Sequence, residues 1–188
     1  MFDINVNINK KLFIVNDFYT DPDSVREYAL KQEYVSDLRY YKGLRSVGTY
    51  LFPRLKETFE EIIGKQIFEW EKGPNGCFQI TNAEDPQVYH FDFQKWAGMI
   101  YLTPNAPIES GTRLMRSRLN QTSHADDSNI DQAFNGGFLD STKFDIVDCA
   151  GNLYNRLVIM DAQTIHSAGP YFGQRPDDGR LVQLFFFN

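Results

Sequence analysis

Apolar and polar positions near the N-terminus follow the periods of one short strand and one amphipathic helix. Residues 11–19, "KLFIVNDFY", form a short apolar run that predicts a strand leading into a turn. Residues 20–34, "TDPDSVREYALKQEY", then show helical spacing of their apolar positions. Thr20 or Asp21 can cap this helix, and Pro22 suits its first turn.

A second helix is predicted at residues 50–63, where apolar residues recur at helical spacing and Gly64 supplies a stop. From about residue 67 the pattern changes to short apolar runs separated by Gly, Pro, Asn and Asp. The predicted strands lie in "QIFEWEK", "GCFQIT", "QVYHFDFQ", "WAGMIYLTP", "GTRLMRSR", "NRLVIMD", "TIHSAGP" and "RLVQLFFF".

Two helices followed by a run of strands predict an α+β chain, mainly β, whose body is a β-sandwich or jelly-roll barrel. A length of 188 residues suits one domain, residues 1–188, with a helical part at about 20–65 and a barrel at about 67–188. Residues 120–140 are polar and rich in turn residues, so we expect a long loop there with a short helical turn.

Composition narrows the functional classes. The net charge of −6 gives no general attraction for nucleic acid or an anionic membrane. The N-terminus lacks a basic region followed by an apolar one, and no apolar run approaches the roughly 18 residues of a membrane span. Cys77 and Cys149 form no metal or redox motif. We therefore expect a soluble, cytoplasmic protein, and the sequence leaves its oligomeric state open.

The pattern His-x-Asp occurs twice, at His90 and Asp92 and again at His124 and Asp126. In a strand, residues i and i+2 project from the same face about 6.6–6.8 Å apart, so one metal ion can collect both side chains. The first pair lies in the strand-like run "YHFDF", with its aromatic residues on the opposite face. The second pair lies among Ser, Thr, Asn and Asp, where solvated loop residues are expected. Context therefore favours His90 and Asp92 as metal ligands.

Two later residues complete a candidate site. His166, in "TIHSAGP", is either a core histidine or the second imidazole of a metal site with His90 and Asp92. Two histidines and one carboxylate leave open positions on Fe(II) for a substrate and O₂. Arg180 shares a strand face with apolar residues and needs a carboxylate partner there. That partner is either a protein side chain or a bound ligand, whose carboxylate the planar arginine fork suits.

Taken together, "HFDF…WAGMIYLTP…SGTRL…NRLVIMDAQTIHSAGPYFG…DGRLVQLFFF" resembles the iron- and 2-oxoglutarate-dependent dioxygenases, particularly small prolyl-hydroxylase-like members. The resemblance spans about residues 75–188 and implies a double-stranded β-helix with supporting N-terminal helices. It implies Fe(II), with O₂ and 2-oxoglutarate as co-substrates, and release of succinate and CO₂. The implied Fe(II) ligands are His90, Asp92 and His166, and the implied 2-oxoglutarate contacts are Arg180, Tyr101 and, more weakly, Gln79 and Asn82.

The substrate is less defined. Arg113, Arg116 and Arg118 either line the site mouth or form a solvated edge strand, and the loop at 120–140 suits a lid. The acidic character of this loop argues against nucleic acid. We expect a peptidyl side chain or a small metabolite as substrate. Two alternatives remain: a cupin-like zinc or manganese hydrolase or isomerase with the same ligands, and a non-catalytic jelly-roll binding module.

Overall fold

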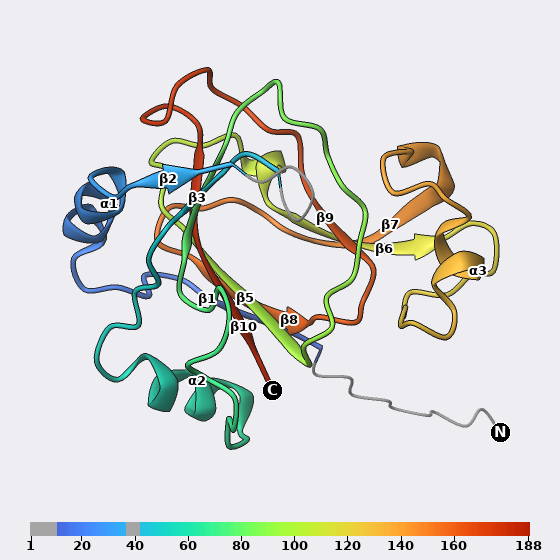
Figure 1. Ribbon diagram of the computed structural model, residues 1–188, viewed down its shortest axis with the longest axis horizontal. Helices are drawn as coiled ribbons and strands as arrows, with labels where there is room; N and C mark the ends of the chain where they lie inside the picture. The colour runs from blue at the N-terminus through green and yellow to red at the C-terminus, as the bar shows by residue number, and fades with distance from the viewer. Residues whose placement is uncertain (1–10, 37–41) are drawn as a thin grey trace, which may run out of the picture.

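The computed structural model describes residues 11–36 and 42–188 (Figure 1). Within these ranges two antiparallel sheets and three α-helices make up most of the regular structure. The elements are β1 Leu12–Val15, α1 Pro22–Leu30, β2 Tyr34–Val35, β3 Leu44–Ser46, α2 Leu55–Ile63, β4 Phe78–Thr81, β5 Trp96–Tyr101, η1 Ile108–Ser110, β6 Thr112–Ser117, α3 Ile130–Phe134, η2 Ser141–Lys143, β7 Phe144–Ala150, β8 Leu157–Asp161, β9 His166–Ala168 and β10 Arg180–Phe187.

The major sheet has seven strands in the order β1-β8-β5-β10-β4-β3-β2, and the minor sheet has three in the order β7-β6-β9. Their inner faces share one apolar core. Met99 and Val182 contribute to it from the major sheet, and Leu114 and Ala150 contribute from the minor sheet. Sheets that meet across a common core form a jelly-roll sandwich. The predicted α+β, mainly β class is therefore confirmed.

The helices α1 and α2 cover the other face of the major sheet (Figure 1). Phe59, at the centre of α2, is fully buried and its ring contacts Trp70, Phe185 and Phe187. The strand β10 is thus buried on both faces, which explains why its sequence is almost continuously apolar. A side chain on its inner face is held by a rigid element.

The predicted start of the first helix and end of the second agree with the structure, whereas the first helix ends at Leu30, before residue 34, and the second begins at Leu55 and not at residue 50. The side chain of Asp21 accepts a hydrogen bond from the Ser24 backbone N–H at 3.1 Å, and Pro22 is the first residue of α1. Gly64 ends α2 in the left-handed conformation that glycine adopts without strain. No helix in residues 11–36 and 42–188 combines the length and the apolar character that a membrane span requires.

The segment after β6 forms a separate small cluster with α3. Its core contains Phe134 and Phe144, which pack with Tyr89 and Phe91 from the segment that precedes β5. Residues 120–140 therefore contain the predicted short helical turn, at Ile130–Phe134. The strand β7 was not predicted, because four of its seven residues are exposed and its sequence does not read as an apolar run.

Two predicted strands are wrong. Residues 66–72, "QIFEWEK", form irregular structure, although Ile67 and Trp70 are buried under α2. Residues 87–94, "QVYHFDFQ", form an extended irregular segment with a single bridge at His90. Its backbone pairs with two different partners in succession, as described below, so no continuous ladder forms.

Candidate metal centre and adjoining cavity

His90 and His166 are joined directly through their backbones. The N–H of His90 donates to the carbonyl of His166 at 3.0 Å, and the N–H of His166 donates to the carbonyl of His90 at 2.8 Å. This reciprocal pair is one rung of an antiparallel ladder, in which opposed side chains project from the same face. The two imidazole rings accordingly lie with their centroids 4.2 Å apart.

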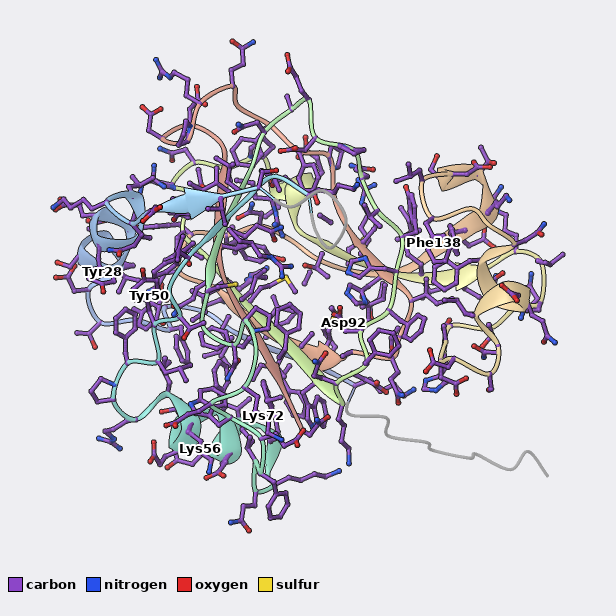
Figure 2. All side chains as sticks on the ribbon, viewed as in Figure 1. Tyr28, Tyr50, Lys56, Lys72, Asp92 and Phe138 are labelled. Atoms are coloured by element: carbon purple, nitrogen blue, oxygen red, sulfur yellow. The ribbon has the colours of Figure 1, made fainter. Side chains whose placement is uncertain are left out.

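Asp92 joins them from the same segment. Its N–H donates to the carbonyl of Ala162 at 2.8 Å, which ties the segment to the end of β8. Its carboxylate oxygens lie 3.4 Å from Nε2 of His166 and 4.0 Å from Nε2 of His90. One potential ligand atom from each of the three residues lies within 4.8 Å of the other two. Figure 2 labels Asp92 near the middle of the molecule.

The ring orientations suit metal binding through Nε2. The carbonyl of Thr164 lies 2.8 Å from Nδ1 of His166, and the carbonyl of Val88 lies 3.2 Å from Nδ1 of His90. A carbonyl can only accept, so each Nδ1 carries the proton and each Nε2 presents its lone pair. Neutral imidazoles that are anchored in this way are the commonest metal ligands among protein side chains.

Burial and neighbouring charges keep His90 and Asp92 in the protonation states that a metal requires. Burial, followed by the nearby His166 ring, lowers the pKa of His90 to about 4, so its imidazole is neutral near pH 7. For Asp92, burial alone would raise the pKa, but the adjacent His166 and His90 side chains and the charge of Arg45 lower it overall. The carboxylate is therefore ionised and the site is ready to accept a cation.

The three residues line a cavity of about 90 Å³ between the two sheets. Arg180 lines the same cavity, and only 4 % of its surface is exposed. Its Nε donates to the Ser110 carbonyl at 3.0 Å, and its guanidinium lies 5.3 Å from the Tyr101 ring centroid and 6.0 Å from that of Tyr171. No carboxylate of residues 11–36 and 42–188 lies within 4.0 Å of this guanidinium.

A buried guanidinium without an anionic protein partner is costly, because the charge loses its hydration. Among residues 11–36 and 42–188 no carboxylate lies close enough to Arg180 to offset this cost. A carboxylate is the best match, because its two oxygens fit the planar guanidinium fork.

The other predicted co-substrate contacts differ in their positions. Tyr101 is fully buried, and its hydroxyl lies 2.8 Å from Oγ1 of Thr112, which lines the cavity. Burial raises the pKa of Tyr101, so its phenol stays protonated near neutral pH. Gln79 lines the cavity, while its side-chain amide donates to the Lys42 carbonyl at 2.7 Å. Asn82 is not among the residues that line the cavity.

The three arginines suggested for the site mouth lie outside this cavity. Arg116 and Arg118 contact Asp145 on the neighbouring strand β7, at 3.3 and 2.7 Å. Arg113 lines a different hollow beside Cys149. The solvated edge strand that the sequence also allowed is wrong, because β6 lies between β7 and β9 at the centre of the minor sheet. His124 likewise lies apart from the metal group and contacts Asp126 at 3.9 Å.

The sequence gave no indication of two further cavity residues, Thr112 and Arg45. Thr112 lies within the "GTRL" run but carries no metal or catalytic signal by itself. Arg45 is on the three-residue strand β3, too short for periodicity to reveal, and its guanidinium lies 5.7 Å from the Phe186 ring centroid. Its charge acts on the site, since it contributes to lowering the pKa of both His90 and Asp92.

No protein-family model matches the sequence, and no curated protein matches it. Solved structures do match in three dimensions. HygX from Streptomyces hygroscopicus, with nickel and 2-oxoglutarate bound, is 10 % identical with a TM-score of 0.65, over 95 % of this chain and 82 % of its own. A Pseudomonas putida prolyl-4-hydroxylase is 13 % identical with a TM-score of 0.53, over 95 % and 92 % of the two chains.

A third match is a prolyl hydroxylase from Trichoplax adhaerens in complex with a peptide fragment of the hypoxia inducible factor oxygen degradation domain. It is 11 % identical with a TM-score of 0.53, over 94 % of this chain and 83 % of its own. These likenesses show that the chain has the double-stranded β-helix fold of iron- and 2-oxoglutarate-dependent oxygenases. The predicted double-stranded β-helix is thus confirmed.

Proposed function

We propose that this protein is an Fe(II)- and 2-oxoglutarate-dependent oxygenase that hydroxylates a small molecule or a peptidyl side chain. The observation that carries the proposal is the pairing of two features in one cavity. A group of two imidazoles and a carboxylate lies beside a buried arginine that has no carboxylate within 4.0 Å among the described residues. Either feature alone has several explanations, whereas together they match a metal and a dicarboxylate.

His90, Asp92 and His166 would hold the metal. The donor set fits Fe(II), because two neutral imidazoles and one carboxylate leave coordination positions open. The backbone bonds of both Nδ1 atoms keep each ring in the tautomer and orientation that binding through Nε2 requires. When bound, iron with 2-oxoglutarate and O₂ supplies oxidative decarboxylation to succinate and CO₂, coupled to hydroxylation of a C–H bond.

Arg180 would bind the C5 carboxylate of 2-oxoglutarate. Its Nε bond to the Ser110 carbonyl fixes the plane of the guanidinium, whose planar fork suits a ligand carboxylate. The phenol of Tyr101 and the hydroxyl of Thr112 form a second polar pair in this region and can donate to the same carboxylate. Because the surroundings are buried, these bonds are stronger than equivalent bonds in water.

Two matched solved structures support this assignment through the molecules that they hold. One holds nickel and 2-oxoglutarate, and another holds a peptide. In HygX the same fold also accommodates hygromycin B. The fold therefore tolerates both classes of substrate that we propose for this chain.

The deciding experiment uses the visible charge-transfer band that Fe(II) and 2-oxoglutarate produce when they bind together without oxygen. The wild-type protein should give the band and the His166→Ala variant should not. His124→Ala is the matched control, because His124 also has an aspartate partner but lies outside the cavity. This control should retain the band at wild-type intensity.

The alternative enzyme and the non-catalytic module give different results. A zinc or manganese hydrolase or isomerase would bind metal through the same residues without any band that depends on 2-oxoglutarate. A binding module would show no metal-dependent signal. The absence of the band in the wild-type protein, or its persistence in His166→Ala, would rule out the oxygenase.

A further inference from the structure

We infer that Asn152 is a positioning residue for the co-substrate, because its buried side chain fixes, through Ser110, the orientation in which Arg180 presents its guanidinium to a carboxylate. The inference rests on the proposed oxygenase function and adds to it a residue outside the cavity. Asn152 lies just after the end of β7, and only 2 % of its surface is exposed. It is not among the residues that line the cavity, so it acts through a neighbour.

The link to Arg180 begins at the backbone of Ser110. Ser110 is the last residue of η1 and is fully buried. Its carbonyl accepts the Nε–H of Arg180 at 3.0 Å. Because a guanidinium is planar, the direction of this bond sets the plane in which the other N–H groups of Arg180 lie. Whatever holds the Ser110 carbonyl in place therefore also orients the fork that a carboxylate would meet.

Two hydrogen bonds from Asn152 hold the η1 turn. Its backbone N–H donates to the Ile108 carbonyl at 3.0 Å, and its side-chain Nδ2 donates to Oγ of Ser110 at 2.9 Å. The Ser110 hydroxyl in turn donates to the Pro107 carbonyl at 2.6 Å. A hydroxyl has a single proton, so its oxygen can only accept from Asn152, and this requirement fixes the orientation of the amide.

The backbone around this turn is closely packed. A Cβ added to Gly111 would lie 1.9 Å from the carbonyl oxygen of Ala150, and one added to Gly169 would lie 1.8 Å from that of Glu109. Three chain segments therefore contact one another backbone to backbone at η1. Since a close-packed interior transmits strain, a displacement of η1 would pass directly to the Ser110 carbonyl.

The Nδ2 bond is the distinctive contribution of the Asn152 side chain. The other polar atom of the amide, Oδ1, is buried without a hydrogen-bond partner among the residues that the structure describes. For burial alone, an apolar side chain of similar size would serve as well, because a buried polar atom without a protein partner adds no stability. The asparagine is therefore explained by the bond that it donates to Ser110.

The test compares co-substrate affinity with metal affinity in Asn152→Leu, which keeps the size of the side chain and removes the donor. The Fe(II)-loaded protein is titrated anaerobically with 2-oxoglutarate and followed by the charge-transfer band, and Mn(II) binding is measured separately by calorimetry. We expect the dissociation constant for 2-oxoglutarate to rise about tenfold, while that for Mn(II) stays within about threefold of wild type. Ser110→Ala removes the receiving hydroxyl, keeps the carbonyl and should show the same separation.

A double variant distinguishes the positioning of Arg180 from a general loosening of the fold. In Arg180→Met the guanidinium is absent, so adding Asn152→Leu should weaken 2-oxoglutarate binding by no more than about twofold beyond Arg180→Met alone. Asn155→Gly is the matched control. Asn155 is also buried, its side chain exchanges two bonds of 2.8 Å with the backbone of Tyr19, and glycine tolerates its left-handed conformation. This control should lower the melting temperature and leave the 2-oxoglutarate titration unchanged.

The outcomes separate this inference from the proposed function. Absence of the band in the wild-type protein would overturn the proposed function and this inference with it. With a normal wild-type band, the inference alone fails if Asn152→Leu binds 2-oxoglutarate within about threefold of wild type, if Mn(II) binding is lost in parallel, or if the two substitutions act independently in the double variant. Should Asn152→Leu fail to fold, Ser110→Ala carries the same comparison.

Discussion

Replacing Arg180 with methionine removes the guanidinium and its charge while keeping a long side chain in the cavity wall. The guanidinium is nearly fully buried, and no carboxylate of the described residues lies within 4.0 Å of it. The substitution should therefore separate co-substrate binding from metal binding. His90, Asp92 and His166 are untouched, so metal affinity should stay within about threefold of wild type, a difference of under 1 kcal/mol.

The expected loss of 2-oxoglutarate affinity follows from the bonds that disappear. A bidentate contact comprises two hydrogen bonds between charged groups, and removing one partner of a buried charged pair costs about 2–5 kcal/mol. Taking about 3 kcal/mol, the dissociation constant for 2-oxoglutarate should rise by about 100-fold, because every 1.4 kcal/mol corresponds to a factor of ten.

The protein without ligand should respond much less. Removing an unpaired buried charge is favourable, but the Ser110 carbonyl loses its donor, at a cost of about 1–3 kcal/mol. Since these terms oppose each other, the melting temperature should change by no more than about 5 °C, at roughly 2–4 °C per kcal/mol for a chain of this size.

The assay is an anaerobic titration of the Fe(II)-loaded variant with 2-oxoglutarate, followed by the charge-transfer band. Arg175→Met is the control, because it removes an exposed guanidinium outside the cavity. If Arg180→Met bound 2-oxoglutarate within threefold of wild type, Arg180 would not be the carboxylate anchor. A parallel loss of Mn(II) binding would instead show that the variant had disrupted the whole site.

Four further outcomes are expected. Phe59→Ala should destabilise the protein by about 3–5 kcal/mol in urea denaturation, because Phe59 is fully buried among aromatic rings, and a loss below 1 kcal/mol would contradict that packing. Tyr101→Phe should weaken 2-oxoglutarate binding about fivefold, the value of one hydrogen bond of about 1 kcal/mol; an unchanged titration would exclude the phenol as a contact. Gly169→Ala should lower the melting temperature measured by calorimetry by about 5 °C, since an added Cβ would lie 1.8 Å from the Glu109 carbonyl oxygen and the chain must shift; an unaltered transition would contradict this close approach. Mn(II) at about 100 times its dissociation constant should stabilise the wild-type protein by about 2.7 kcal/mol and should not stabilise His166→Ala, as thermal shift measurements would reveal.

The sequence predicted the elements whose periodicity is set by burial on one or two faces. β10 lies where its apolar run predicted it, and α2 ends at Gly64 as expected. The strands β2 and β3 were missed because runs of two or three residues carry no period. Arg45 was missed with them, since only the register with Gln79 places it on the inner face.

The three residues of the candidate metal group could be chosen from the sequence, although the local structure around His90 and Asp92 was wrongly predicted. Residues 87–94 were expected to form a strand, which would place His90 and Asp92 on one face. They do share a face of the cavity, but through separate bonds to His166 and Ala162. The side chains of His90 and Asp92 therefore lie on one side of the segment, as the i, i+2 spacing predicted, although the segment forms no continuous ladder. What the sequence could not supply was the partner of Arg180, because a pairing between distant residues depends on the completed fold.

The reciprocal backbone bonds between His90 and His166 have a consequence for metal choice. They fix the spacing of the two imidazoles through the backbone itself, so neither ring can move away from the other without breaking these bonds. A set of nitrogen and oxygen donors binds divalent metals in the general order in which copper and zinc exceed iron. Metal availability then influences which ion occupies the site. Preparations should therefore carry mixed metals until they are stripped with a chelator and reloaded with one metal under nitrogen.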